Sequence, residues 1–187
     1  MQIHGGFGFC EDTGSAQHFL DARIAPIYEG TNGIQAIDLV LRKLPLRDGA
    51  VIKEHLAVIG TTVDELSGAG PDLLPMQAAL AAALAATTKA TEWLVDHHDR
   101  PDDQLAGATP YLRLLATTTA AWLEARTALV ASAQLAAGTG DAAFLRAKVI
   151  NARFFCEQLL PPVVGLVAAI TTGAAVLFAL AVEDLAN

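Results

Sequence analysis

Beyond residue 49, apolar residues recur along most of the chain at the spacing that places them on one side of a helix. Runs rich in Ala, Leu and Thr alternate with short Gly-, Pro- and Asp-containing breaks. The expected helices span residues 50–67, 72–98, 104–136 and 141–180. Short connections between long helices are typical of an antiparallel bundle, so we expect an all-α fold here.

Local signals refine these helices. Asp72 and Asp141 stand where side-chain N-caps are expected. Pro161-Pro162 is expected to split the last segment near residue 160, because proline cannot continue the hydrogen-bonding pattern of a helix. The uncharged stretch Val163–Val182 is long enough to span a bilayer. It lacks flanking Lys, Arg, Trp or Tyr anchors, so we favour a buried bundle helix over a membrane anchor.

Residues 1–48 have a different texture, rich in Gly and without Ala runs. We expect a loop at Gly5–Gly8, a helix over 15–20 and an extended or turn-like lead-in over 22–28. A further helix is expected to start at Thr31 or Asn32, with Gln35 completing a weak capping box. Its apolar face comprises Ile34, Ile37, Val40, Leu41 and Leu44. The Pro- and Gly-bracketed turn at 45–49 predicts a boundary between domains 1–48 and 49–187.

Composition and charge exclude several classes of protein. The chain is 53% hydrophobic and 17% charged, which is too apolar for intrinsic disorder. A net charge of −8 without a Lys/Arg cluster argues against nucleic-acid binding. Two distant cysteines exclude a disulfide scaffold and make a cysteine-type zinc site improbable. The first residues have neither a basic nor an apolar leader character, so we expect no signal peptide and a cytoplasmic protein.

The sharpest chemical signal is Tyr28-Glu29-Gly30-Thr31-Asn32-Gly33. The apolar ring of Tyr28 would desolvate Glu29 and favour its neutral form, which suits a general base near neutral pH. Gly30 would let a substrate approach the backbone, and the amides of Thr31, Asn32 and Gly33 are free helix-start donors that could hold a phosphate. An ordinary turn with an acid near a helix start is the alternative from chemistry alone.

Two other patterns are weaker. Gln2-Ile3-His4-Gly5-Gly6-Phe7-Gly8 permits close backbone approach to a ligand, but its glycine spacing does not fit a dinucleotide fingerprint. The adjacent His97 and His98 point to different faces of a helix and would chelate one ion poorly, so we predict no metal site.

Three motifs in order carry a resemblance: Gln2 to Phe9, then Asp21-Ala22-Arg23-Ile24, then Ile27 to Gln35. Together they resemble the C-terminal helical region of FAD-dependent acyl-CoA dehydrogenases, over about residues 2–44. Residues 49–187 resemble, more loosely, the extra helical domain of the larger members, the broad-range fatty acyl-CoA and methylmercaptopropionyl-CoA dehydrogenases. The resemblance therefore implies oxidation of acyl-CoA thioesters to trans-2-enoyl-CoA.

The resemblance also implies roles for single residues. Glu29 matches the base that removes the α-proton of the thioester while the β-hydride leaves to the flavin. Gly30 matches a position whose backbone touches acyl-CoA. The matched contacts to FAD are Gln2, Ile3, His4, Gly5, Gly6, Thr31, Asn32 and Gly33. Implied partners are acyl-CoA, a second copy or a larger acyl-CoA dehydrogenase subunit, and electron-transfer flavoprotein as the acceptor.

The chain departs from the family pattern in two ways. Leu20 precedes Asp21 where the family usually has Arg, and the family's N-terminal helical and β domains do not precede the first motif. Met1 therefore looks like an internal residue used as a start, and we expect the isolated chain to have little or no dehydrogenase activity. Two alternatives stay open: a non-catalytic module that completes a split enzyme, and a helical-bundle remnant without chemistry.

Overall fold

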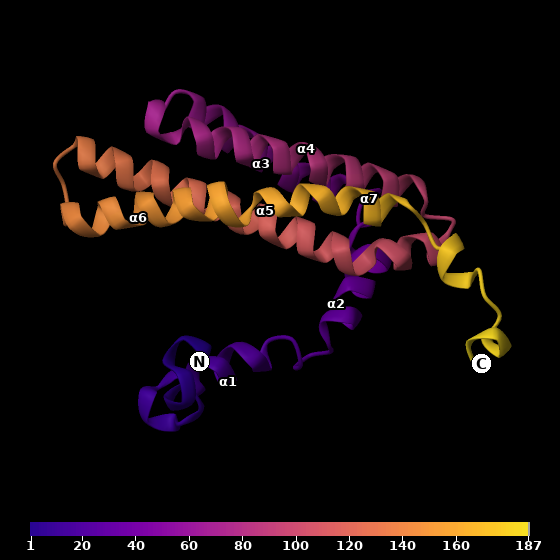
Figure 1. The fold of residues 1–187 in the computed structure, drawn as a ribbon. Helices are drawn as coiled ribbons and strands as arrows, with labels where there is room; N and C mark the ends of the chain where they lie inside the picture. Colours follow the sequence, from indigo (N-terminus) through magenta and orange to yellow (C-terminus); the bar gives the residue numbers. More distant parts are fainter. Residues whose placement is uncertain (187) are drawn as a thin grey trace. The chain divides into compact units, whose positions relative to one another are not determined.

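The computed structural model describes residues 1–186, which are helices and turns without any strand. They form two compact units, Met1–Ala36 and a larger one that begins at Ile37. The all-α prediction is therefore confirmed for the described residues (Figure 1).

The first unit contains little buried structure. Two 3₁₀ turns, Gln2–Phe9 and Glu11–Thr13, lead into α1 (Ser15–Ile24). The helix expected over 15–20 is thus longer. The loop expected at Gly5–Gly8 is a 3₁₀ turn with a kink at Gly5, whose backbone is non-helical. Most of the unit's large apolar side chains are exposed, and its buried residues are Gly8 and Ala36.

The chain then turns tightly toward α2 (Asn32–Asp38). The amides of Ile27 and Tyr28 both donate to the carbonyl oxygen of Ile24, at 2.9 and 3.1 Å. The lead-in over 22–28 is therefore helical and then turn-like, and the extended alternative is wrong.

The helix that begins at Asn32 ends in a wider π turn, Leu39–Lys43, which packs against α5 of the second unit. Ala36, Val40 and Leu44 are its buried residues, one helical turn apart. The predicted apolar face is wrong for Ile34, Ile37 and Leu41, which are exposed. The second compact unit thus begins before the turn at 45–49, and the domain boundary at residue 48 stays a prediction.

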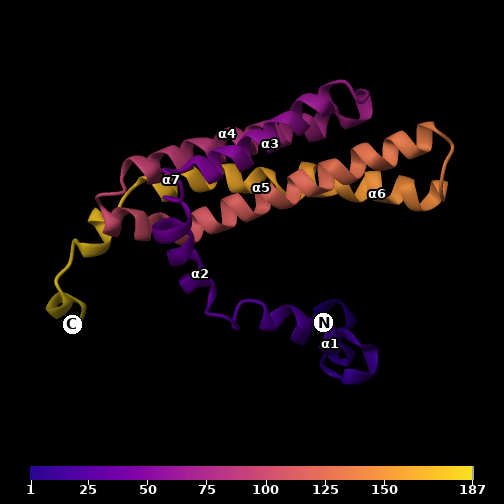
Figure 2. The same ribbon diagram turned by 180° about the vertical axis from the view of Figure 1, so that it is seen from behind.

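The second unit is an antiparallel helical bundle, as predicted (Figures 1 and 2). Its main helices are α3 (Ala50–Ser67), α4 (Leu74–Asp96), α5 (Pro101–Ala136) and α6 (Ala142–Phe154). A π turn (Phe155–Leu159), a 3₁₀ turn (Pro161–Gly165) and α7 (Leu166–Thr171) continue from α6. The expected break near residue 160 is therefore confirmed. The long α5 packs against α3, α4, α6 and α7, so it is the central element of the bundle.

Helix starts test the predicted caps. Asp141 caps α6, because its Oδ1 accepts hydrogen bonds from the amides of Ala143 and Phe144 at 2.8 and 3.1 Å. The Asp72 prediction is wrong: a 3₁₀ turn starts at Pro71, and α4 follows from Leu74 without a side-chain cap. Because the 3₁₀ turn begins at Pro71, Asp72 lies inside this turn and not at the position before α4 where a cap would stand.

The bundle core combines large side chains with many alanines. Its largest fully buried side chains include Ile59, Leu66, Met76, Leu80, Leu94, Tyr111 and Leu114. Small residues such as Ala121 and Ala125 on α5 let neighbouring helices approach closely. Burial of about 25 cal/mol per Å² of apolar surface is the main stabilising contribution in such a core.

Hydrogen bonds between helices fix their register. The hydroxyls of Thr87 and Thr118 lie 3.0 Å apart, and those of Thr91 and Tyr111 lie 2.8 Å apart. The Trp122 indole nitrogen donates to Thr62 Oγ1 at 3.0 Å. Each pair would leave a buried polar atom unsatisfied if the helices slid along one another, at a cost of about 1–3 kcal/mol.

The end of the bundle differs from the prediction. The last helix stops at Thr171 and not near 180, because Gly173 turns into the left-handed region (φ +77°). The Ala174 amide then donates to Asp103 Oδ1 at 2.8 Å, which ties this turn to the start of α5. Ile170 and Ala174 are buried as expected, whereas the side chains from Val176 to Val182 are mainly exposed.

One helical segment, Ala142–Thr171, is long and apolar enough to cross a membrane by length and composition alone. This overlaps only in part with the stretch Val163–Val182 weighed from the sequence. The segment carries Arg146, Lys148, Arg153 and Glu157, and α6 packs along α5. These features favour a bundle helix with one open face.

Candidate functional site

The first predicted motif forms a compact turn at the start of the chain. The His4 amide donates to the Met1 carbonyl oxygen at 3.0 Å, and Gly5 has a positive φ of +58°. Gly8 is buried against Met1, where an added Cβ would lie 1.9 Å from the carbonyl oxygen. Glycine is therefore required at position 8 for the turn itself. Gln2 and Ile3 are exposed, with Ile3 98% accessible.

The remaining glycines of this motif have an open side. A Cβ added at Gly5 or Gly6 would meet no atom within 4 Å. The backbone there is accessible to another molecule, as expected for close approach of a ligand. The positive φ of Gly5 provides a conformation that other residues adopt only with strain.

The second motif positions Glu29 in an unusual backbone conformation. Glu29 has φ +55° and Gly30 has φ +97°, so two consecutive residues occupy the left-handed side of the φ range. This conformation costs an L-residue other than glycine about 1–2 kcal/mol. Such strain is often concentrated at functional sites, where the fold holds it in place. A Cβ at Gly30 would also lie 3.0 Å from Ile34 Cγ2.

Gln35 stabilises this turn from within α2. Its Nε2 donates to the Glu29 carbonyl oxygen at 2.7 Å, and its amide donates to the Thr31 carbonyl oxygen at 3.0 Å. The predicted capping box to Asn32 is therefore wrong, because the Gln35 side chain reaches back six residues. The result is a fixed main-chain path for Glu29 and Gly30.

The carboxylate of Glu29 lies in solvent. Glu29 and Tyr28 are both exposed, and no hydrogen bond or ion pair to the Glu29 carboxylate occurs among residues 1–186. The desolvation expected from Tyr28 is thus not provided by this chain. A general base at Glu29 would need apolar cover from the substrate and from other protein surfaces.

The structure keeps the two motifs at separate ends of the first unit. Helix α1 and the following turn connect them, and α1 packs against the 3₁₀ turn Gln2–Phe9 (Figure 1). The intervening Asp21 is bound to its own helix, with Gln17 Nε2 donating to Asp21 Oδ1 at 2.7 Å. Leu20, the departure from the family pattern, is exposed beside it. No hydrogen bond among the described residues joins Gln2–Gly6 to Glu29–Gly33.

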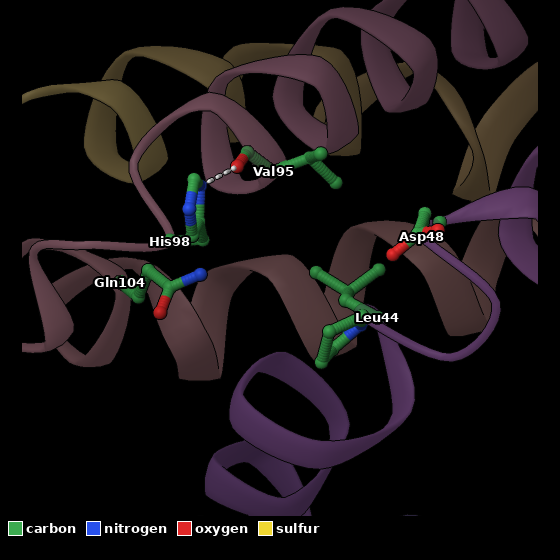
Figure 3. A pocket seen from close by; sticks show the side chains of 7 residues that line it. Leu44, Asp48, Val95, His98 and Gln104 are labelled. Carbon is green, nitrogen blue, oxygen red and sulfur yellow. Dashed lines mark hydrogen bonds between the residues drawn. The ribbon is translucent and has the colours of Figure 1, made fainter.

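The second unit has a separate pocket of about 250 Å³, which the sequence did not indicate. It is lined by Leu44, Pro45, Asp48, Gly49, Val95, His98 and Gln104 (Figure 3). His98 is positioned by a 3.2 Å hydrogen bond from Nδ1 to the Val95 carbonyl oxygen. The buried Gln104 donates from Nε2 to the Leu94 carbonyl oxygen at 2.8 Å.

One wall of this pocket is a strained turn. Arg47, Asp48 and Gly49 have successive φ values of +50°, +57° and +78°. The Pro and Gly in this stretch signal a turn, but no sequence pattern identifies two non-glycine residues in this conformation. None of the residues predicted for FAD or acyl-CoA lines the pocket. His97 precedes the pocket residue His98 in the chain, and its ring stacks on Trp93 with ring centroids 4.0 Å apart.

The residues predicted for FAD fit that group in their chemistry. Residues Gln2–Gly6 include no carboxylate side chain. Their backbone amides and open glycines suit the phosphates of a dinucleotide. The amides of Thr31, Asn32 and Gly33 open α2, where the helix dipole also favours an anion. These residues cover only part of a cofactor as large as FAD.

Comparison with known proteins defines the class. The family model described as "Acetyl-CoA dehydrogenase C-terminal like" matches residues 54–181, and the model described as "Acyl-CoA dehydrogenase, C-terminal domain" matches residues 1–44. Both descriptions name a C-terminal region, and the two matches flank the turn at 45–49. The chain belongs to the acyl-CoA dehydrogenase family.

Individual relatives agree with this assignment. The chain is 44% identical over 162 residues to 3-methylmercaptopropionyl-CoA dehydrogenase of Ruegeria pomeroyi, covering 86% of this chain and 27% of that protein. It is 36% identical over 175 residues to the broad-specificity linear acyl-CoA dehydrogenase FadE5 of Mycobacterium tuberculosis, covering 86% and 28%. A butyryl-CoA dehydrogenase of Syntrophomonas wolfei is 28% identical over 170 residues, covering 88% and 27%. The chain thus spans little more than a quarter of the relatives' length.

Proposed function

We propose that this chain supplies the catalytic base and part of the FAD site of an enzyme that oxidises acyl-CoA to trans-2-enoyl-CoA. The observation that carries the proposal is the strained turn at Glu29–Gly30, held by Gln35 inside a segment that matches the family's C-terminal domain. This turn fixes the path of the backbone and presents a carboxylate at its apex.

In this reaction Glu29 accepts the proton from the α-carbon of the thioester. Gly30 is the position at which the acyl-CoA would approach the main chain, and within this chain the lack of a side chain there avoids Ile34. The amides of Thr31, Asn32 and Gly33, together with Gln2, Ile3, His4, Gly5 and Gly6, would hold FAD. FAD, when bound, supplies the acceptor for the β-hydride.

Exposure of the Glu29 carboxylate explains why we propose that the isolated chain has little or no activity. Water stabilises the carboxylate and weakens it as a base toward a carbon acid. Apolar surface from a larger acyl-CoA dehydrogenase subunit or a second copy would exclude that water. The exposed apolar residues of the first unit support such docking, and they include Phe7, Phe9, Phe19, Leu20, Ile24 and Ile27. Electron-transfer flavoprotein is the proposed electron acceptor of the complete enzyme.

The same exposed residues are what a non-catalytic module that completes a split enzyme would present. The two functions differ in what they require of Glu29. Only the catalytic role needs a carboxylate at the apex of the turn, whereas docking needs the apolar surface alone. The helical-remnant alternative requires neither.

The test is a chimera in which this chain replaces the segment that it matches in the Ruegeria pomeroyi enzyme. We expect dehydrogenation of 3-methylmercaptopropionyl-CoA by the chimera, and a loss of about 10²–10⁴-fold in kcat on Glu29→Gln. The matched control is Glu11→Gln, an exposed acid in the same unit, which should leave kcat unchanged. Equal activity of the Glu29→Gln and Glu11→Gln chimeras would contradict the proposed base.

A further inference from the structure

The α5–α6 hairpin carries an open groove of about 440 Å³. Its apolar floor includes Leu123 and Val130 of α5 and Phe144 of α6, each more than half exposed. The Lys148 ammonium nitrogen lies 5.2 Å from the centroid of the Phe144 ring, so one wall combines an aromatic and a cation. The groove therefore offers apolar surface beside positive charge.

The positive charge of the groove is not balanced locally. Arg126 and Lys148 line it, and neither forms an ion pair in the described part of the chain. The whole chain has a net charge of −8, whereas this one apolar groove is lined by two cations and no carboxylate. The surface is complementary to a segment with apolar side chains and carboxylates.

The end of the same chain has that chemistry. After Arg153 the sequence contains no Lys or Arg, and Glu183 and Asp184 are its charged residues beyond Glu157. The preceding side chains Val176, Leu177, Phe178, Leu180 and Val182 are each more than 60% exposed. Two short 3₁₀ turns, Ala175–Phe178 and Val182–Ala186, carry all of these residues except Leu180, which lies between the turns. We call residues 175–184 the acidic tail.

The acidic tail cannot reach the groove of its own chain. The hydrogen bond from Ala174 to Asp103 anchors it at the start of α5. Arg126 lies further along α5 by about 35 Å, at 1.5 Å per residue. Nine residues from Ala174 to Glu183 span at most about 32 Å when fully extended, and less in 3₁₀ turns. The tail and the α5–α6 connection also lie at opposite ends of the second unit (Figures 1 and 2).

We propose that the acidic tail of one chain docks in the α5–α6 groove of a second copy, and that the exchange is reciprocal. Because tail and groove occupy opposite ends of α5, two copies related by a twofold axis across the middle of α5 bring both pairs together. Such an arrangement is closed and produces a dimer, not a filament. Glu183 and Asp184 pair with Arg126 and Lys148 at each end.

The open face of α6 supports this arrangement. Between the groove and the Pro161 turn, α6 and its extension also expose the apolar side chains of Ile150, Phe154 and Leu159. An antiparallel second copy would cover them while it aligns both tails. A lipid bilayer is the competing occupant, but the bundle already uses the opposite side of α6, and Arg146 and Arg153 interrupt the apolar surface.

Sedimentation equilibrium of the 187-residue chain tests the proposal by charge exchange. We expect a dimer of the 19.5 kDa chain. Arg126→Glu with Lys148→Glu should weaken dimerisation by about tenfold or more, and so should Glu183→Lys with Asp184→Lys. Combining all four substitutions should restore the dimer, because each tail again meets the opposite charge. Lys53→Glu with Lys89→Glu, two exposed lysines on α3 and α4, is the matched control and should leave dimerisation unchanged.

Disulfide trapping tests which chains pair. In a Cys10→Ser background, chains carrying Glu183→Cys are mixed with chains carrying Arg126→Cys, while Cys156 is buried. We expect a disulfide between the two different chains. A monomeric wild-type chain, a fourfold variant no better than either double variant, or binding to phosphatidylcholine vesicles in place of self-association would overturn the proposal. These tests concern the second unit, so they are independent of the role of Glu29.

Discussion

At the scale of single residues, the strained backbone at Glu29 is the observation on which the proposed function rests. The motif identifies Glu29 and Gly30 from their order and spacing, and the resemblance assigns them a role. The positive φ of Glu29 could not be predicted, because it depends on the Gln35 side chain six residues away. The exposure of its carboxylate was also unexpected. Desolvation depends on surfaces packed against the turn, which local sequence does not specify.

Tyr111 gives a prediction at this scale. Burial raises the pKa of Tyr111 to about 12, partly opposed by its hydrogen bond with Thr91. The unfolded phenol has a pKa near 10, so the folded chain retains this proton more strongly. The contribution of this protonated phenol to the free energy of unfolding is therefore fully present below about pH 10. It is lost as the pH rises toward 12, by up to about 3 kcal/mol. Denaturant unfolding from pH 9 to 12 measures this loss.

The control for this titration is Tyr111→Phe, which lacks the ionisable group. It should be less stable at pH 9, since Thr91 loses a buried hydroxyl partner. Its stability should also fall less between pH 10 and 12 than that of the wild type. Parallel pH profiles of the two proteins would show that Tyr111 does not titrate in this way.

At the scale of elements, helix starts and ends were predicted well where residues close to them in the sequence determine them. Asp141 caps α6 through amides two and three residues away, and the prolines at 161–162 end the preceding helical segment. The end of the last helix was wrong by several residues. It depends on the Asp103–Ala174 hydrogen bond, which joins residues 71 positions apart. The two π turns that precede Pro45 and Pro161 were not predicted either.

Substituting alanine for each of two helical glycines should change the stability of the bundle in opposite directions. A Cβ at Gly107 of α5 would lie 2.8 Å from the Ile170 carbonyl oxygen, whereas one at Gly60 of α3 would make an ordinary 3.7 Å contact with Leu84. Gly107→Ala should destabilise the bundle by about 1–3 kcal/mol, because α7 must shift. Gly60→Ala should stabilise it by about 0.5–1 kcal/mol through helix propensity. Urea unfolding of the two variants measures both changes in the free energy of unfolding. Stabilisation by both substitutions would mean that α7 does not pack closely at Gly107.

At the scale of the whole molecule, the chain combines a bundle with its own core and a smaller unit with little buried structure. The bundle could be predicted from helical periodicity. The resemblance, and then the family matches, identified the first unit, whose own hydrophobic pattern gives no core. Under the proposed function, the exposed turn at Glu29 is completed by other protein surface. We therefore expect proton abstraction by Glu29 only in an assembly that covers the first unit with other protein surface.

The most direct test of this account is exchange of the substrate α-proton. The chimera described above is incubated with 3-methylmercaptopropionyl-CoA in D₂O, and α-deuteration is followed by NMR together with the flavin absorption spectrum. We predict that exchange depends on Glu29: Glu29→Gln abolishes it while the flavin spectrum is retained, and Glu11→Gln changes neither. Undiminished exchange in the Glu29→Gln chimera would contradict the assignment of Glu29 as the base.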